Sequence, residues 1–334
     1  MHGHGTMLDG LIQFDQEKIG YIQNPYNDLW QVDSGLLHVN NDYLNSLKKY
    51  NLVIVDMSQE HWGTRGAIDS LATTFTDNNI NYVILSHEPN DHAPDNNIIF
   101  YPLFYHWGVQ NFQRTKIAFD LEKSYKLGCL NSNPRPHRIA NFLKLSNKSY
   151  FESCSITFSD TRDSGSTRDD DIELTNDELL FWNIISPTLP NKKPPQHLSF
   201  AGINLPALTD SYTHLVTEAC IFPRLFVTEK VWKPVASGQL FFVLGTPGTI
   251  NYLRNCGVDV FDDYIDHAHY DNEQDWRKRL ELLYEVIDDF MTKDLYSIHM
   301  QTLERRIANH TKFYQGLFDT KYREILLNLI KQHS

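Results

Sequence analysis

Short apolar runs alternate with longer polar or amphipathic stretches in the first half of the chain. Residues 52–56 (LVIVD) form a β-branched apolar run that follows a stretch with helical character at 41–50. Two similar runs lie at 82–85 (YVIL) and 98–104 (IIFYPLF). Such runs are typical of parallel strands buried on both faces, and the segments between them are long enough for crossover helices. The pattern therefore predicts an α/β fold.

The second half of the chain repeats this alternation. We expect short strands at 126–130, 214–217, 240–244 and 258–261. Helical spacing of apolar residues predicts further helices at 138–145, 228–236, 249–255, 273–287, 303–313 and 322–330. Gly257, which follows one of these helices, suits the left-handed position that ends many helices. Both halves thus have the layout of an open α/β domain.

The two blocks of strands and helices meet near residues 125–130. A chain of 334 residues is long enough for two such domains. We place the first domain at 1–127, the second at 128–316 and a C-terminal helix at 317–334 that packs back on the first domain. Ligands of open parallel sheets bind outside the carboxyl ends of the strands, often between domains. The predicted architecture is two Rossmann-like domains that face a cleft, with C-terminal helices.

One segment of the second half departs from this pattern. Residues 159–178 hold many Asp, Ser and Thr and almost no apolar side chains, which predicts an exposed loop. It includes three successive carboxylates at 169–171, for which a solvated loop is favoured over metal ligation. A Pro-rich connector follows at 189–197.

Composition and charge narrow the functional classes. The chain carries 30 Lys and Arg against 42 Asp and Glu, a net charge of −12, and duplex binding relies on basic side chains that neutralise phosphates. No run approaches 18 apolar residues, and the N-terminus lacks the features of a signal peptide. We expect a cytoplasmic protein of a bacterial or a virus-infected host cell. The widely spaced cysteines favour reduced thiols over a zinc site; they are Cys129, Cys154, Cys220 and Cys256.

The densest group of chemically useful residues lies at 218–245. Thr228 can cap a helix whose first turn holds Glu229 and Lys230. A helix N-terminus presents unpaired N–H groups and a partial positive charge, which suit a phosphate, and Lys230 adds a full charge there. Glu218 and Glu229 are acceptors for the hydroxyls and amines of a ribose or a base. An ordinary capped helix with surface charges is the alternative interpretation.

This stretch resembles the donor-binding segment of the family-10 α-1,3-fucosyltransferases. The residues that carry the resemblance are Glu218, Pro223, the triplet at 228–230 (TEK), Trp232, Gly238 and the strand with glycine at 243–245. The resemblance implies the two-domain GT-B fold and a nucleoside-diphosphate sugar as donor, usually GDP-fucose. It also implies that Glu218 and Glu229 contact the nucleoside or the sugar and that Lys230 contacts the phosphates. Ala219 stands where the family commonly has Asn.

A second stretch resembles the same family and lies in the expected order. Ser132, Asn133 and Pro134 followed by Arg138 are similar to the family's Ser-Asn segment and the helical Arg that meets the diphosphate. Arginine suits this contact because its planar fork binds phosphate oxygens in pairs and keeps its charge. Arg135 is a neighbouring candidate for the same contact. The alternative interpretation of Arg138 is an arginine that faces solvent at the start of a helix and binds no ligand.

A third stretch, at 86–90 (SHEPN), resembles the acceptor-side loop of the family. Inverting sugar transfer needs a group that takes the proton of the acceptor hydroxyl as the anomeric carbon is attacked. Glu88, at the end of the strand predicted at 82–85, is the first candidate for this base. His87 and Glu60 are alternatives for the same role, and a plain loop carboxylate is the structural alternative for Glu88.

Other phosphate and metal motifs are absent from the sequence. Neither G-x-x-x-x-G-K-[ST] nor G-x-G-x-x-G occurs, so helix ends and side chains must hold a phosphate. Gly245 begins a tight turn that leads into a helix. This turn either borders the donor or has no role in binding. The segment 87–92 (HEPNDH) lacks the two-His helical spacing of a zinc site, and Pro89 opposes a helix. We expect no metal and no required cofactor.

These observations lead to three functional hypotheses. The first is a metal-independent inverting glycosyltransferase whose partners are a nucleotide sugar and a glycan acceptor. In it Glu88 acts as base, and Arg138 with Lys230 neutralises the leaving nucleoside diphosphate. The second replaces the glycan with a hydroxymethylated base in DNA, which the net acidity disfavours. The third is an inactive module that binds a nucleotide or a sugar.

Overall fold

The structure is a computed structural model. It describes residues 15–22, 30–33, 36–57, 65–86, 97–100, 102–112, 117–131, 134–157, 174–185, 202–203, 205–221, 225–318 and 320–334. The chain divides into two compact units, the first formed by Met1–Trp107 with Asp319–Ser334 and the second by Gly108–Phe318. The boundary expected near 127 therefore falls inside the second unit. Among the described residues, no helix combines the length and the apolar character that crossing a membrane requires.

A four-stranded parallel sheet forms the centre of the first unit. Its strands lie in the order β1-β4-β5-β6, with bounds β1 Ile19–Ile22, β4 Leu52–Met57, β5 Tyr82–Ser86 and β6 Ile98–Phe100. The strands predicted at 52–56 and 82–85 are confirmed. The third apolar run is a strand only up to Phe100, because Pro102 has no N–H for a neighbouring strand and helix α4 (Leu103–Asn111) begins directly after it. A separate antiparallel hairpin joins β2 (Trp30–Asp33) and β3 (Leu36–Val39).

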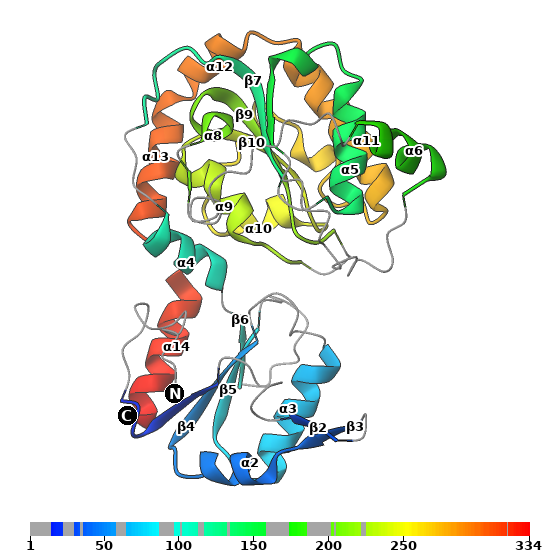
Figure 1. Ribbon diagram of the computed structural model, residues 1–334. Helices are drawn as coiled ribbons and strands as arrows, with labels where there is room; N and C mark the ends of the chain where they lie inside the picture. The colour runs from blue at the N-terminus through cyan, green and yellow to red at the C-terminus, as the bar shows by residue number, and fades with distance from the viewer. Residues whose placement is uncertain are drawn as a thin grey trace. The chain divides into compact units, whose positions relative to one another are not determined.

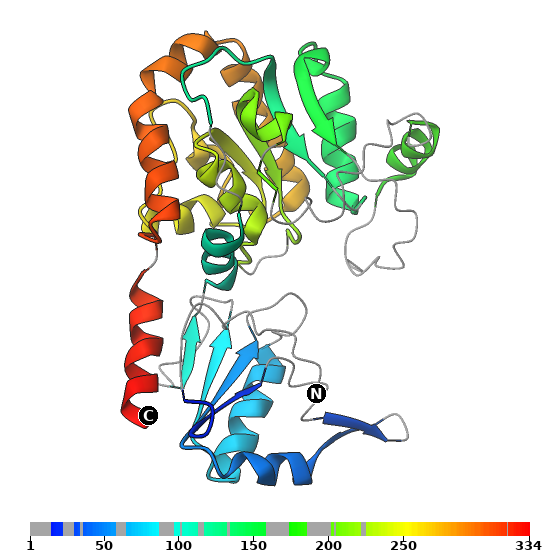
Figure 2. The same ribbon diagram turned by 60° about the vertical axis from the view of Figure 1, so that its left-hand side comes forward.

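Alternation along the strands sorts the apolar side chains of this sheet onto two faces. The odd-numbered apolar residues of β4 pack with α2 (Asn41–Leu47) and α3 (Arg65–Asp77). The even-numbered ones pack with Leu326 and Ile330 of α14 (Thr320–His333). Figure 2 shows α14, in red, on one side of the sheet and α3 on the other. The C-terminal helix thus completes the core of the first unit.

The second unit contains another four-stranded parallel sheet. Its strands lie in the order β10-β9-β7-β8, with bounds β7 Tyr125–Leu130, β8 Cys154–Thr157, β9 Ser211–Thr217 and β10 Leu240–Leu244. The strands predicted at 126–130, 214–217 and 240–244 are confirmed. Strand β8 was not predicted, because its four residues (CSIT) are only half-buried and carry no apolar run. Two parallel sheets, one in each unit, confirm the α/β class.

Helices cover both faces of the second sheet. Their bounds are α5 Pro136–Ser146, α6 Asn176–Ile185, α8 Pro206–Thr209, α9 Glu229–Ala236, α10 Thr249–Asn255, α11 Trp276–Met291, α12 Leu295–Gln301 and α13 Leu303–Tyr314, with 3-10 helices η1 Phe151–Ser153 and η3 His267–His269. Helices α5 and α11 lie on one side of the sheet, and α9 and α13 on the other (Figure 1). The predicted helices are confirmed, and Gly257 takes the expected left-handed conformation, with φ 89°. Of the segment predicted as a loop at 159–178, residues 176–178 begin α6, and residues 159–173 lie outside the described part.

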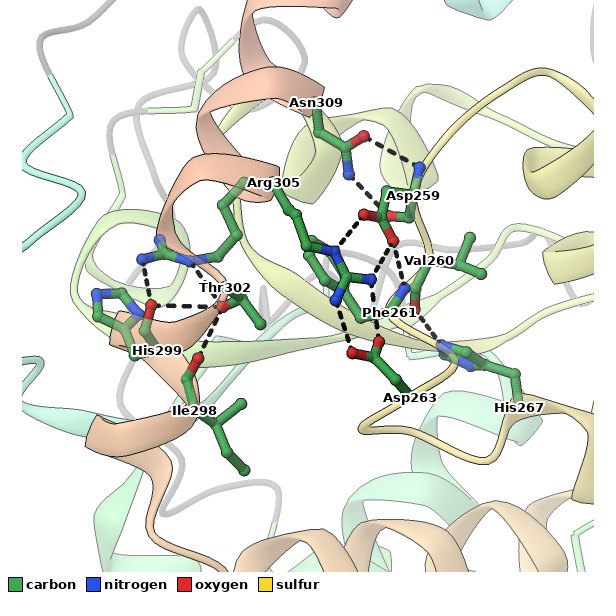
Figure 3. Close-up of polar contacts among 11 residues, drawn as sticks. Asp259, Val260, Phe261, Asp263, His267, Ile298, His299, Thr302, Arg305 and Asn309 are labelled. Carbon is green, nitrogen blue, oxygen red and sulfur yellow. Dashed lines mark hydrogen bonds and ion pairs between the residues drawn. The ribbon is translucent and has the colours of Figure 1, made fainter.

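The segment 258–261, predicted as a strand, is instead an irregular loop held by α13 (Figure 3). Asn309 exchanges two hydrogen bonds with the backbone of Asp259, at 3.1 Å and 2.7 Å. Arg305 pairs with the carboxylate of Asp259 and with that of Asp263, two residues after the loop. Phe261 has φ 63°, in the left-handed region that strands do not use. Side chains of a helix, not a neighbouring strand, therefore satisfy part of this backbone.

Candidate functional site

The strand order of the second sheet reverses between β7 and β9. From β7 the chain passes to β8 on one side and then returns to β9, which pairs with the other side of β7. Ligands of open parallel sheets bind outside the carboxyl ends of the two strands at such a reversal. Here Asn131 and Glu218 directly follow the two strands, and Thr217 Oγ1 donates a hydrogen bond to Asn131 Oδ1 that ties the strand ends together. The fold thus places the candidate site at this edge.

Three side chains at the start of α5 hold the main chain that follows β9. Arg138 Nη2 donates to the carbonyl oxygens of Thr217, at 3.3 Å, and Glu218, at 3.0 Å. His137 Nε2 lies 2.9 Å from the same oxygen of Glu218, and Arg135 donates to the next carbonyl along. Burial, helped by the charge of Arg138, lowers the pKa of His137 well below its ordinary value. His137 is therefore neutral at pH 7 and carries its proton on Nε2, because a carbonyl only accepts.

A fourth basic side chain reaches the same loop from α11. Arg279 is 1% exposed, and its Nη2 donates to the carbonyl oxygen of Ile221 at 3.0 Å. Its Nη1 donates to the carbonyl oxygen of Glu273. Burial lowers the pKa of Arg279 to about 10, so the side chain stays charged at neutral pH. Three guanidinium groups thus lie against one loop, and their summed charge makes this edge attractive to anions.

The carboxylate of Glu218 is fully buried and is used within the protein. Thr228 donates to it twice, from its backbone N at 2.8 Å and from its hydroxyl at 2.6 Å. The backbone N of Ala219 donates to it at 2.9 Å. Burial raises the pKa of Glu218, and the charge of Lys230 with the hydrogen bonds from Thr228 offsets part of the rise. Glu218 therefore joins the end of β9 to the start of α9.

The first turn of α9 carries the remaining donor-side candidates. Thr228 is the N-cap, and its side chain accepts a hydrogen bond from the backbone N of Lys230, as the sequence predicted. Lys230 Nζ lies 2.9 Å from Glu229 Oε1 and 3.2 Å from Thr228 Oγ1, and its side chain is 23% exposed. Burial acts to raise the pKa of Glu229, but Lys230, and to a lesser extent Lys233, holds it below its usual value. A partly exposed ammonium thus lies at the positive end of a helix.

Gly245 belongs to the same cluster. It follows β10, and a Cβ added there would lie 3.3 Å from Cγ of Glu218 and 3.2 Å from Oγ1 of Thr249. The absence of a side chain lets this backbone pass close to the Glu218 side chain. The structure therefore brings together Arg135, Arg138, Glu218, Thr228, Glu229, Lys230 and Gly245. Glu60, His87, Glu88 and Asn133 lie outside the described residues.

Sequence reasoning missed three residues in or beside this cluster. Arg279 reaches the loop from a helix about sixty residues further along the chain, and no local motif marks it. His137 directly precedes Arg138 at the start of α5, so its place in the first helical turn was a usable signal. Lys233 is also close, one helical turn after Glu229 and 7% exposed; burial lowers its pKa to about 8.

The described residues contain no group of three His, Cys, Asp or Glu side chains placed to hold a metal ion. The three carboxylates at 169–171 and the segment 87–92 lie outside the described part.

Comparison with family models and with curated proteins identifies no relative of this chain. No protein-family model matches the sequence, and no curated protein matches it. The resemblance to the α-1,3-fucosyltransferases therefore remains a hypothesis based on the residues quoted above.

Proposed function

We propose that this protein is an inverting glycosyltransferase that uses a nucleoside-diphosphate sugar and transfers the sugar to a hydroxyl of a glycan acceptor. The observation that carries the proposal is the position of Lys230. It lies in the first turn of α9, beside the reversal of strand order, with Arg135, Arg138 and Arg279 against the adjoining loop. The GT-B arrangement and fucose as the sugar come from the resemblance alone.

In the proposed reaction, the positive charges stabilise the leaving nucleoside diphosphate. Lys230 contacts the phosphates directly, because its ammonium is partly exposed at the positive end of a helix. Arg138 is 3% exposed and donates to carbonyl oxygens, so it acts as a fixed charge at short range. A charge held in a water-poor site stabilises a developing anion without reorganisation during the reaction. These side chains take the place of a divalent cation, and the proposal includes no resident cofactor.

The acceptor side of the proposed reaction needs a base. We assign this role to Glu88, with His87 and Glu60 as alternatives, because the resemblance implies a carboxylate in this loop. The base removes the proton of the acceptor hydroxyl while the hydroxyl oxygen attacks the anomeric carbon from the face opposite the leaving diphosphate. Attack from that face inverts the configuration of this carbon.

Calorimetric titration with GDP, UDP, CDP and dTDP tests the donor half of the proposal. We expect one of them to bind, and the Lys230→Ala variant to bind it about 10- to 100-fold more weakly, since a hydrogen bond to a charged group contributes about 1.5–3 kcal/mol. Lys278→Ala is the matched control, because this lysine side chain is 66% exposed and forms an ion pair with the side chain of Glu273. The proposal is wrong if the native protein binds none of the four, or if Lys230→Ala binds as tightly as Lys278→Ala. Release of the nucleoside diphosphate from the matching sugar nucleotide then tests transfer.

A further inference from the structure

The surroundings of Glu218 leave its carboxylate no surface for a ligand. The residue is 0% exposed, and its two oxygens accept three hydrogen bonds, from Ala219 N, Thr228 N and the Thr228 hydroxyl. Both oxygens of the side chain thus already accept hydrogen bonds from protein donors, and neither is open to solvent.

The Thr228 hydroxyl has only one possible pattern of hydrogen bonds. An ionised carboxylate only accepts, and both the backbone N–H and the ammonium of Lys230 only donate. The hydroxyl therefore donates its one hydrogen bond to Glu218 Oε2, at 2.6 Å. Its two lone pairs accept from Lys230 N, at 3.4 Å, and from Lys230 Nζ, at 3.2 Å. Glu218, Thr228 and Lys230 form a chain of hydrogen bonds whose direction the carboxylate sets.

The hydrogen bonds to Thr228 and Glu229 orient the Lys230 ammonium and leave it partly exposed. This ammonium has three N–H donors; one faces Glu229 Oε1 at 2.9 Å and one faces Thr228. Among the residues that the structure describes, the third N–H has no acceptor, and the side chain is 23% exposed. A flexible lysine that is already oriented loses less freedom when an anion binds, so orientation before binding increases affinity.

We infer that Glu218 is a positioning residue: through the hydroxyl of Thr228 it orients the Lys230 ammonium toward the bound diphosphate, and it does not touch the ligand itself. This inference rests on the proposed function, in which Lys230 contacts the diphosphate. It differs from the direct contact with nucleoside or sugar that the resemblance implies for Glu218.

Glu218→Gln is the informative substitution, because it keeps the shape and changes one acceptor into a donor. With its NH2 at the position of Oε2, the amide faces the Ala219 N–H and donates a hydrogen bond to the Thr228 hydroxyl oxygen, which then no longer accepts from Lys230 in the same way. With the NH2 at the position of Oε1, the amide faces the N–H of Thr228. One donor meets another in either orientation. The first reverses the hydrogen bond between residue 218 and the Thr228 hydroxyl, and the second pushes away the backbone of Thr228, which carries the hydroxyl that contacts Lys230.

Two substitutions at Thr228 provide matched partners for this variant. Thr228→Val keeps the shape and removes the hydroxyl, and Thr228→Ser keeps the hydroxyl. Both leave Glu218 unchanged, so they test the chain even if Glu218→Gln fails to fold, which far-UV circular dichroism would reveal. The probe is whichever of GDP, UDP, CDP and dTDP binds the native protein, titrated by calorimetry into each variant alone and combined with Lys230→Ala.

We expect Glu218→Gln and Thr228→Val each to weaken binding about tenfold and Thr228→Ser to bind as the native protein does, in line with the coupling measured between residues of one network. In the Lys230→Ala background, neither Glu218→Gln nor Thr228→Val should weaken binding further, because their effect passes through Lys230. Additive losses in that background overturn the inference, since they place Glu218 on the ligand or in a general structural role. Unchanged binding in Glu218→Gln and Thr228→Val overturns the inference and leaves the proposed function standing. A native protein that binds none of the four nucleotides overturns both.

Discussion

Arg279→Met tests whether the basic groups beside the loop after β9 hold that loop in place. Methionine keeps much of the length and apolar stem of the arginine side chain and removes all its donors. In the native protein, Arg279 donates to the carbonyl oxygens of Ile221 and Glu273, and its side chain has 1% exposure. The substitution therefore leaves two carbonyl oxygens of a buried site without their donor.

The magnitude follows from these two hydrogen bonds. Each hydrogen bond from a charged group contributes about 1.5–3 kcal/mol, so the two together contribute about 3–6 kcal/mol. Removing a buried charge also removes its desolvation cost, which places the expected loss near the lower end, at about 3 kcal/mol. Arg277→Met is the matched control on the same helix. The Arg277 side chain is 39% exposed and pairs with Glu178, and such an ion pair contributes about 1 kcal/mol or less.

Hydrogen exchange followed by mass spectrometry measures the loss where it occurs. Peptides that cover 211–221 report the free energy with which β9 and its following loop open. We expect Arg279→Met to lower this free energy by about 2 kcal/mol more than Arg277→Met does, which is the difference between the two values above. Equal exchange in the two variants would refute the reasoning, because it would mean that Arg279 does not hold the loop.

Two further predictions concern the second unit as a whole. Gly128→Ala should lower the free energy of unfolding by about 3 kcal/mol in urea titrations, because its Cβ would lie 1.9 Å from the carbonyl oxygen of Ala207. Gly257→Ala, at φ 89° with no atom within 4 Å of the new Cβ, should cost only about 1–2 kcal/mol, and equal losses would contradict the steric argument. Burial lowers the pKa of both His214 and His267 to about 4, so the unfolded chain binds more protons between pH 6.5 and 4 and stability falls as pH falls through that window. His214→Asn should make this decline shallower, and an unchanged slope in urea titrations from pH 7 to 4 would show that His214 does not titrate on unfolding.

Most strands of the two sheets were predictable because their side chains are buried on both faces. The runs at 52–56, 82–85 and 240–244 are apolar at nearly every position, and burial on two faces requires such a pattern in a parallel sheet. Strand β8 lacks it, because its side chains are only half-buried. At 258–261, apolar residues lie in a loop whose backbone is satisfied by α13, an arrangement that local sequence cannot reveal.

The first turn of α9 was predictable from neighbouring residues, whereas its contacts with more distant residues were not. Thr228 as N-cap and Lys230 in the first helical turn followed from residue types alone, because capping involves residues only a few positions apart. The role of Glu218 did not follow, because its contact with Thr228, ten residues further along the chain, forms only when the end of β9 and the start of α9 meet in the folded protein. Arg279 was not predicted for the same reason, since its contact with Ile221 joins residues that the sequence separates by 58 positions.

The sequence by itself determined the α/β class, most strands and helices, and the basic and acidic residues at 218–230, because each depends on burial patterns or on neighbours along the chain. Only the tertiary structure decided the strand order, and with it the reversal between β7 and β9 that places Arg138, Glu218 and Lys230 around one loop. It also decided how the C-terminal helix, which the sequence predicted to pack back on the first domain, joins the core of the first unit, through Leu326 and Ile330. The physical reason is that pairing of distant strands and burial of distant side chains are settled by packing of the whole unit, and local sequence constrains them only weakly.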